Sequence, residues 1–241
     1  MAGFSPTVEK FWRASWSSGE VCYRDDVLLI ASDPGVRDDR RVTILRTGSQ
    51  TIAVLSPDTA ERVFRPRAGA ITEPEFRGML AAAGITLHAA DHLFYFTDQS
   101  RPELLAETAP PGVRALTAED QEAFRLFESS ASVEDLDAAY VELDHWAVVG
   151  AFDGTTLACV ASMYPWQDSR LADLGVLTLP AYRGQGLGRA VVREICRQAC
   201  QRGYEPQYRC QADNTASMRL AASSGLSWFG DWAVVSPDSA K

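Results

Sequence analysis

The 241-residue chain lacks the sequence features of a membrane protein and of a metal-binding protein. No apolar run approaches the length needed to span a bilayer. The first residues, Met-Ala-Gly-Phe-Ser-Pro, lack the cationic and apolar regions of a signal peptide. The three histidines show no metal-ligand spacing, and the five cysteines are odd in number and scattered. We therefore expect a cytoplasmic protein with buried thiols, no metal ion and no membrane partner.

The chain also has fewer positively charged residues than negatively charged ones. The 23 Lys and Arg residues face 32 Asp and Glu residues, which gives a formal net charge of −9. Most of this excess lies in the C-terminal half, and the stretch from Glu128 to Asp144 holds six acidic residues without one Lys or Arg. An acidic chain of this kind argues against binding to nucleic acid and favours a cationic ligand.

A glycine-rich turn begins directly after a short apolar segment in the second half of the chain. The apolar segment is Leu174–Leu177, and the turn runs from Thr178 to Gly188. Apolar residues then recur every four positions from Leu187 to Ala199, so the turn leads into an amphipathic helix. Its glycines allow several backbone N–H groups to face one point at the helix start, where the helix dipole also favours an anion. The turn therefore predicts a pyrophosphate-binding loop.

The order of residues in this loop separates it from two common phosphate binders. It lacks the Gly-Lys-Ser/Thr ending of a P-loop and the Gly-x-Gly-x-x-Gly spacing of a Rossmann turn. Its pattern is Arg-x-x-Gly-x-Gly, formed by Arg183, Gly186 and Gly188. The opposite stripe of the following helix is expected to face solvent and contains Arg189, Arg193 and Arg197.

A second segment follows about 26 residues after the loop and runs from Asn214 to Leu226. Asn214 and Ser217 have the chemistry to cap a short helix, and Gly225 is a natural residue to end it. The two segments, in this order and at this spacing, resemble the acetyl-CoA signature of the GNAT N-acetyltransferase superfamily. The resemblance covers about residues 113–237.

This resemblance implies an α/β fold with a mixed, mostly antiparallel sheet flanked by helices for a catalytic domain at residues 113–241. Residues 1–112 are expected to form an N-terminal α/β accessory domain, either a degenerate copy of the same fold or a packing and dimerisation domain. The segment 101–112 contains Pro102 and the run Ala-Pro-Pro-Gly, so we expect it to be the linker. Near the C-terminus, Gly230-Asp231 is expected to be a turn between two strands. A homodimer is an open alternative to a monomer.

The resemblance also implies that acetyl-CoA is the acyl donor, acting as a co-substrate. It would pair with the backbone of the strand that precedes the loop, whose N–H groups would also polarise the thioester carbonyl. Thr178 stands where the family often has Val, which a backbone contact tolerates. The residues implied for this site are Leu177, Thr178, Leu179, Arg183, Gly184, Gln185, Gly186, Leu187, Gly188, Arg189, Asn214 and Ser217.

The acceptor implied by the resemblance is a small-molecule amine. A primary amine with a pKa of ~10.4 must lose a proton before it attacks. Asp173, on the strand before the loop, is the expected base, and Glu142 is the reserve. Glu142 and Asp144 end the acidic stretch and are expected to bind the ammonium group, with His145 and Tyr164 as further acceptor residues. His145 has the intrinsic pKa of a base, although a single His before an apolar strand is more often structural.

One position departs from the family pattern. Many GNAT enzymes have a Tyr seven residues after the Asn, where it protonates the departing thiolate, and this chain has Ala221 there. A thiol with a pKa of ~8.5 leaves largely as thiolate, so an acid is helpful but dispensable. Tyr208 on the neighbouring strand is one candidate replacement. The alternative function, from another class, is a non-catalytic acyl-CoA-binding regulatory module.

Overall fold

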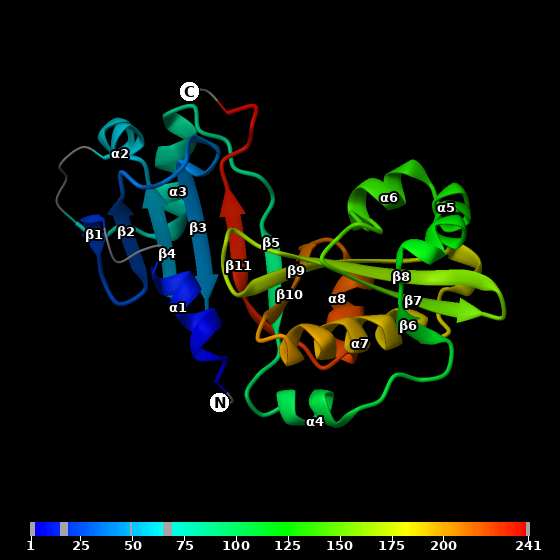
Figure 1. Cartoon of the computed structure of the whole chain (residues 1–241). Helices are drawn as coiled ribbons and strands as arrows, with labels where there is room; N and C mark the ends of the chain where they lie inside the picture. Colours follow the sequence, from blue (N-terminus) through cyan, green and yellow to red (C-terminus); the bar gives the residue numbers. More distant parts are fainter. Residues whose placement is uncertain (1–2, 15–18, 49, 65–68, 240–241) are drawn as a thin grey trace. The chain divides into compact units, whose positions relative to one another are not determined.

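The computed structural model describes residues 3–14, 19–48, 50–64 and 69–239 (Figure 1). These residues form two compact units, each assembled from separate stretches of the chain. The first unit contains residues 3–8, 94–209 and 214–228, and the second contains the remaining described residues of 9–93, 210–213 and 229–239. Both units therefore draw on residues from either side of position 112, and the boundary expected there stays a prediction.

In the first unit, strands lie in the order β10-β9-β8-β7-β6. β10 pairs with β9 in parallel, whereas the other neighbours are antiparallel, so this sheet is mixed and mostly antiparallel as expected. The strands are β6 (Val113–Ala115), β7 (Ala147–Asp153), β8 (Thr156–Pro165), β9 (Leu171–Thr178) and β10 (Glu205–Gln211).

Helices cover both faces of these strands (Figure 1). Helices α5 and α6 pack on one face, over a cluster of buried side chains that includes Phe127, Val160 and Leu177. Helix α7 packs on the other face, next to α4 and α8, and buries the apolar stripe predicted from its four-residue spacing. The helices are α4 (Arg101–Ala106), α5 (Gln121–Ser129), α6 (Val133–Ala139), α7 (Leu187–Gln201) and α8 (Thr215–Ser223).

In the second unit, strands lie in the order β1-β2-β4-β3-β11, with β2 and β4 parallel. Helices α2 and α3 accompany them, and the core includes Ile30, Ile44 and Phe76. The helices and strands of this unit are β1 (Glu20–Arg24), β2 (Leu28–Ser32), β3 (Val42–Thr47), β4 (Gln50–Leu55), α2 (Pro57–Val63) and α3 (Glu73–Ala82). Three further elements have residues in both units: α1 (Pro6–Ala14), β5 (Asp91–Tyr95) and β11 (Ser227–Val234). Among the described residues, no helix is long and apolar enough to cross a membrane.

The expected linker at 101–112 is partly helical, and one expectation about a turn is wrong. The segment 101–112 begins with α4, whose Leu104 is fully buried. Gly230 and Asp231 lie inside β11 rather than in a turn between two strands. A Cβ on Gly230 would lie 2.6 Å from the carbonyl oxygen of Arg46 on β3, so this glycine permits the close approach of two paired backbones.

Candidate active site

The glycine-rich loop connects β9 to α7 and has the backbone conformation that its glycines allow. Gly184 and Gly186 have φ angles of +78° and +83°, in the left-handed region that other residues rarely adopt. A Cβ at either position would meet no atom of the described residues within 4 Å, so those residues leave the space beside both glycines open. These two glycines are therefore required by the turn and leave room for a ligand rather than for internal packing.

Helix α7 begins without a side-chain cap. Gly186 is its N-cap residue, and no side chain in the described part of the chain accepts from the first backbone N–H groups. The first intrahelical bond runs from the N–H of Ala190 to the carbonyl of Gly186, at 3.1 Å. The N–H groups of Leu187, Gly188 and Arg189 are thus directed at the exposed loop, where the helix dipole favours negative charge. This arrangement fits the pyrophosphate of CoA.

Two arginines near this loop donate hydrogen bonds to backbone carbonyls. Arg183 donates from Nε to the carbonyl of Thr178 at 3.1 Å, and its terminal nitrogen pairs with Asp135 of α6 at 2.9 Å. Arg189 donates to the carbonyl of Ser223 at 2.8 Å, at the C-terminal end of α8. Both guanidinium groups therefore brace the loop and the helix beside it. Gln185, exposed in the loop, donates to the carbonyl of Ala181 at 3.3 Å.

Strand β9 loses its parallel partner before it ends. Its pairing with β10 covers Leu171 to Leu174, whereas its pairing with β8 continues to Thr178. The N–H of Leu179 donates to the carbonyl of Ala158 beside β8, at 3.0 Å. Because backbone groups alternate in direction along a strand, Leu177 also faces β8, while Val176 and Thr178 face the edge that β10 has left.

This alternation refines the predicted backbone contacts. Of the three residues implied by the resemblance, Thr178 presents its N–H to the open edge, and the N–H groups of Leu177 and Leu179 point at β8. Val176 was not among the predicted residues, and it faces the open edge as well. Counting two positions back from Thr178 would have found it.

Comparison with known proteins bears directly on this geometry. The model of the Acetyltransferase (GNAT) family matches residues 113–226, which span β6 to the end of α8 and include the loop and the diverging strands. These residues are a GNAT acetyltransferase domain. The family implies acyl transfer from an acyl-CoA.

The first of two solved structures supports a likeness at the level of the fold. A GNAT-family acetyltransferase from Colwellia psychrerythraea has a TM-score of 0.53 and 16% identity, covering 90% of this chain and 80% of that chain. A GCN5-related N-acetyltransferase from Kribbella flavida has a TM-score of 0.46 and 22% identity, covering 68% of this chain and 64% of that chain. A comparison with curated proteins found no match.

The second segment of the GNAT signature forms α8 as expected. The side chain of Asn214 accepts from the N–H of Ser217 at 3.0 Å, and Gly225 follows the helix with a φ of +90°. The Ser217 hydroxyl lies 2.7 Å from that of Tyr208, the last residue of β10 that pairs with β9. Ala221 is fully buried. The buried Tyr208 hydroxyl is therefore tied to α8 at the point where the two strands separate.

Asp173 is buried on β9 and accepts several hydrogen bonds. Its Oδ1 accepts from Gln207 at 2.7 Å, and its Oδ2 accepts from Arg209 at 2.8 Å and from Tyr164 at 3.3 Å. The Gln207 amide is itself fixed, because its oxygen accepts from the Tyr95 hydroxyl. Burial, followed by the Asp173 charge, raises the pKa of Tyr164 to about 12, so this hydroxyl stays protonated. Asp173 thus lies in a network of side chains that fixes its position on β9.

A second group of polar side chains lies on the same face of β8, next to this network. The Nδ1 of His145 is 2.8 Å from the hydroxyl of Ser162, and its Nε2 is 3.6 Å from a carboxylate oxygen of Glu142. The His145 ring contacts the rings of Tyr140 and Tyr164, with centroids 5.1 and 5.0 Å away. The Glu142 side chain is about half exposed, at 48%, whereas that of His145 is only 10% exposed.

Tyr140 and Ser162 were missed by sequence reasoning. Tyr140 ends α6 in the left-handed conformation with a φ of 48°, which is uncommon for a residue other than glycine. Gly175 lies opposite Ser162 in the sheet, and a Cβ there would overlap the carbonyl oxygen of Ala139. The missing side chain lets the end of α6 approach β9 and brings Tyr140 to His145. Neither residue has a spacing that could have revealed this.

The remaining predicted residues have different surroundings. Asp144 is exposed and has no hydrogen bond or ion pair within the described part of the chain. Arg193, expected to face solvent, is buried, which is a correction to that prediction. It donates to Glu107 at 2.5 and 2.6 Å and to the carbonyl of Ser224 at 2.6 Å. Arg197 pairs with Glu194 on its own helix at 2.7 Å.

Neither a metal site nor a cysteine nucleophile is supported by the described residues. No group of three or more His, Cys, Asp or Glu side chains is arranged to hold a metal ion there. Burial raises the pKa of Cys159 to about 12 and that of Cys200 to about 11, so both thiols stay protonated at neutral pH.

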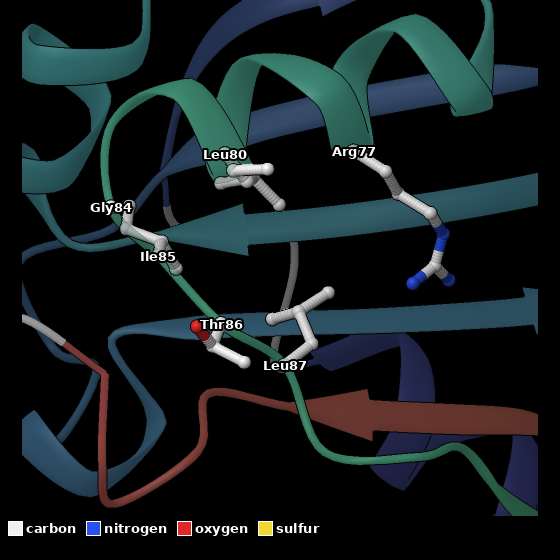
Figure 2. Close-up of a pocket in the computed structure, with 7 residues that line it drawn as sticks. Arg77, Leu80, Gly84, Ile85, Thr86 and Leu87 are labelled. Atoms are coloured by element: carbon white, nitrogen blue, oxygen red, sulfur yellow. The ribbon is translucent and has the colours of Figure 1, made fainter.

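A separate pocket of about 350 Å³ lies in the second unit (Figure 2). Residues of α3 and of the segment that follows it line the pocket, among them Leu80, Ile85 and Leu87, with Thr86 and Arg77 as polar members. Arg77 is paired with Glu73 at 2.9 Å. The lining of this pocket is therefore mostly apolar, and its charged residue, Arg77, is already paired with Glu73.

Proposed function

We propose that the GNAT domain transfers an acetyl group from acetyl-CoA to a primary amine of a small, cationic molecule by direct attack. The observation that carries this proposal is the divergence of β10 from β9 directly before an uncapped helix N-terminus. One stretch of chain thereby offers backbone groups along an extended strand edge and an anion site at its end. The thioester supplies an activated carbonyl carbon.

The chain's own residues have distinct tasks in this proposal. The N–H groups of Leu187, Gly188 and Arg189 bind the pyrophosphate, and Arg183 keeps the loop attached to the end of β9. The N–H of Thr178, at the open edge of β9, orients the reacting carbonyl. These donors are fixed by the backbone before any ligand binds, so little reorganisation is required.

The acceptor amine is mostly protonated at neutral pH and needs a base. We favour Glu142, because its carboxylate is half exposed and can reach an incoming ammonium group, while the neighbouring Tyr140 ring is exposed as well. Asp173 stays the alternative base. Its buried carboxylate is stabilised by Arg209 and Gln207, which favours an anchoring role. Asp144 adds negative charge close to Glu142 in the sequence.

Cationic acceptors should therefore react with higher kcat/KM than neutral or acidic amines of matched size. The advantage should shrink as salt is added, because exposed charges are screened. The test is thiol release from acetyl-CoA with an amine panel, using wild type, Glu142→Gln, Glu142→Gln with Asp144→Asn, and Asp173→Asn. Glu142→Gln should lower kcat by about 10²-fold or more while CoA binding is retained.

Two outcomes would contradict this assignment. If acidic or neutral amines are the best acceptors, the acidity around Glu142 is ordinary surface charge. If Asp173→Asn lowers the amine-dependent rate and alters its pH profile while Glu142→Gln does neither, Asp173 is the base.

The second candidate function is an acyl-CoA-binding module without chemistry. It is favoured by Ala221, a buried residue that lacks the hydroxyl of the usual Tyr. Calorimetric binding of CoA without thiol release for any amine in the panel would favour this module.

A further inference from the structure

Ser162 is fully buried and has a single hydroxyl hydrogen to place. Its oxygen accepts from the backbone N–H of Glu142 at 3.2 Å. Among the described residues, the acceptor within reach of its own hydrogen is the Nδ1 of His145, at 2.8 Å. A buried hydroxyl without an acceptor is costly, so the hydrogen is placed between Oγ and Nδ1.

This geometry decides the tautomer of the imidazole. A neutral imidazole carries one N–H, and its other nitrogen is an acceptor. If Nδ1 carried the proton, the Ser162 oxygen would face two donors, and its own hydrogen would be buried without a partner. Nδ1 is therefore the acceptor, and the proton of neutral His145 is on Nε2.

The protonated Nε2 faces Glu142. Its distance of 3.6 Å from the carboxylate oxygen is longer than a hydrogen bond, but the half-exposed Glu142 side chain can close it by a small rotation. Catalytic hydrogen bonds are often long in the absence of ligands and shorten when the substrate binds. The Tyr140 and Tyr164 rings pack against the imidazole and restrict its rotation.

We propose that His145 is a positioning residue, fixed by Ser162 as the Nε2–H tautomer, and that it donates from Nε2 to orient the Glu142 carboxylate toward the acceptor amine. His145 is thus excluded as the base, since one ring nitrogen is occupied by Ser162 and the other already carries a proton. The inference rests on the proposed function in that it assigns the base to Glu142, but the tautomer follows from the protein alone.

The tautomer is measured directly by two-bond ¹H–¹⁵N correlation spectra of the ¹⁵N-histidine-labelled protein, at about pH 8.5, two units above the ordinary imidazole pKa of ~6.5. The chain has three histidines, and His145→Gln assigns the signal. His92 serves as an internal reference, because its Nδ1 is 2.6 Å from an oxygen of Asp231, a carboxylate that can only accept. We expect the Nε2–H pattern for His145 and the opposite pattern for His92.

Ser162→Ala should abolish the single-tautomer pattern of His145 and leave that of His92 unchanged. Ser224→Ala is the matched control, since Ser224 is also fully buried in the same unit and its hydroxyl has no hydrogen-bond partner among the described residues. An Nδ1–H pattern for His145 in the wild type, or a His145 pattern that Ser162→Ala does not change, would overturn the proposal.

Kinetics separate positioning from base catalysis. Glutamine can place an N–H near the position of Nε2, so His145→Gln should retain much more kcat than His145→Ala, for which we expect a loss of up to about 10²-fold. Equal loss in both variants, together with loss of the acidic limb of the pH–rate profile, would show that His145 is the base. If no amine is acetylated by the wild type, the proposed function fails, while the spectra still decide the tautomer.

Discussion

Replacing Gly175 by alanine should destabilise the first unit and impair acceptor turnover, while the phosphate loop stays intact. A Cβ at this position would overlap the carbonyl oxygen of Ala139 and lie 3.1 Å from that of Tyr140. Both obstacles are backbone atoms at the end of α6, so no side-chain rotation can relieve the overlap. The strand or the helix end must move, and Tyr140 and Glu142 move with it.

The size of the effect follows from two opposing terms. Overpacking of a well-packed interior typically costs about 1–3 kcal/mol. Alanine returns about 0.4–1 kcal/mol, because it restricts the unfolded chain more than glycine does. The net loss should be about 1–2 kcal/mol, which for a chain of this length corresponds to a fall of roughly 2–8 °C in the thermal midpoint.

Thermal unfolding monitored by circular dichroism gives the stability, and calorimetry gives the CoA affinity. Gly78→Ala is the control, since Gly78 lies inside α3 with nothing within 4 Å of a Cβ, so alanine should stabilise that helix by up to about 1 kcal/mol. The reasoning would be refuted if Gly175→Ala left both the midpoint and the amine-dependent kcat/KM unchanged. It would also be refuted if CoA affinity fell as much as turnover did.

Two further predictions concern the loop and the effect of acid. Gly186→Asp should weaken CoA binding at least about tenfold, or about 1.4 kcal/mol, by placing a charge beside the pyrophosphate; Gly186→Ala isolates the backbone strain at the φ of +83°, and unchanged calorimetric affinity in the Asp variant would remove the loop from the binding site. The hydrogen bond from Arg114, with smaller contributions from Thr117, lowers the pKa of Asp120 from 3.8 to about 2. The paired carboxylate therefore stabilises the fold above pH 4, and this stability is lost as the pH falls toward 2. Urea unfolding of Asp120→Asn should show about 1 kcal/mol less stability at pH 7, because Arg114 is half exposed, and a difference from wild type that does not shrink in acid would contradict the assignment.

The elements around the loop could be predicted because their determinants are local. Gly184 and Gly186 adopt positive φ angles because glycine has no Cβ, and Asn214 caps α8 with its own side chain. Thr117 and Asp120 likewise form a capping box before α5. Each of these interactions joins residues within a few positions of one another, so pattern and structure agree.

The errors occur where distant residues decide the outcome. Gly230 looks like a turn residue, but the backbone of Arg46 on β3 makes it part of a strand. Arg193 belongs to a charged stripe, but it is buried because it donates hydrogen bonds to Glu107, which lies 86 positions earlier in the chain. The sequence also predicts a hairpin around Gly48-Ser49. Ser49 lies outside the described residues, and β3 and β4 on either side of it pair as antiparallel strands.

The candidate site shows the same division. The anion site could be found from the spacing of Arg183, Gly186 and Gly188, whereas the neighbours of Glu142 could not. Ser162 lies twenty positions away, and its contact with His145 depends on the register of β7 against β8 and on the end of α6. A sequence pattern contains residue types, but it does not specify which of two carboxylates is exposed and which is held by an arginine.

The pairing of β11 with β3 has a consequence for biosynthesis. Arg46 to Thr43 of β3 pair with Asp231 to Val234, which the ribosome makes long after β3 itself. Until they emerge, β3 presents an unpaired edge, the kind of surface on which nascent chains associate with one another. The second unit therefore cannot complete its sheet until β11 has been made, long after β1 to β4. Premature termination shortly before residue 231 would release a chain in which this edge stays open.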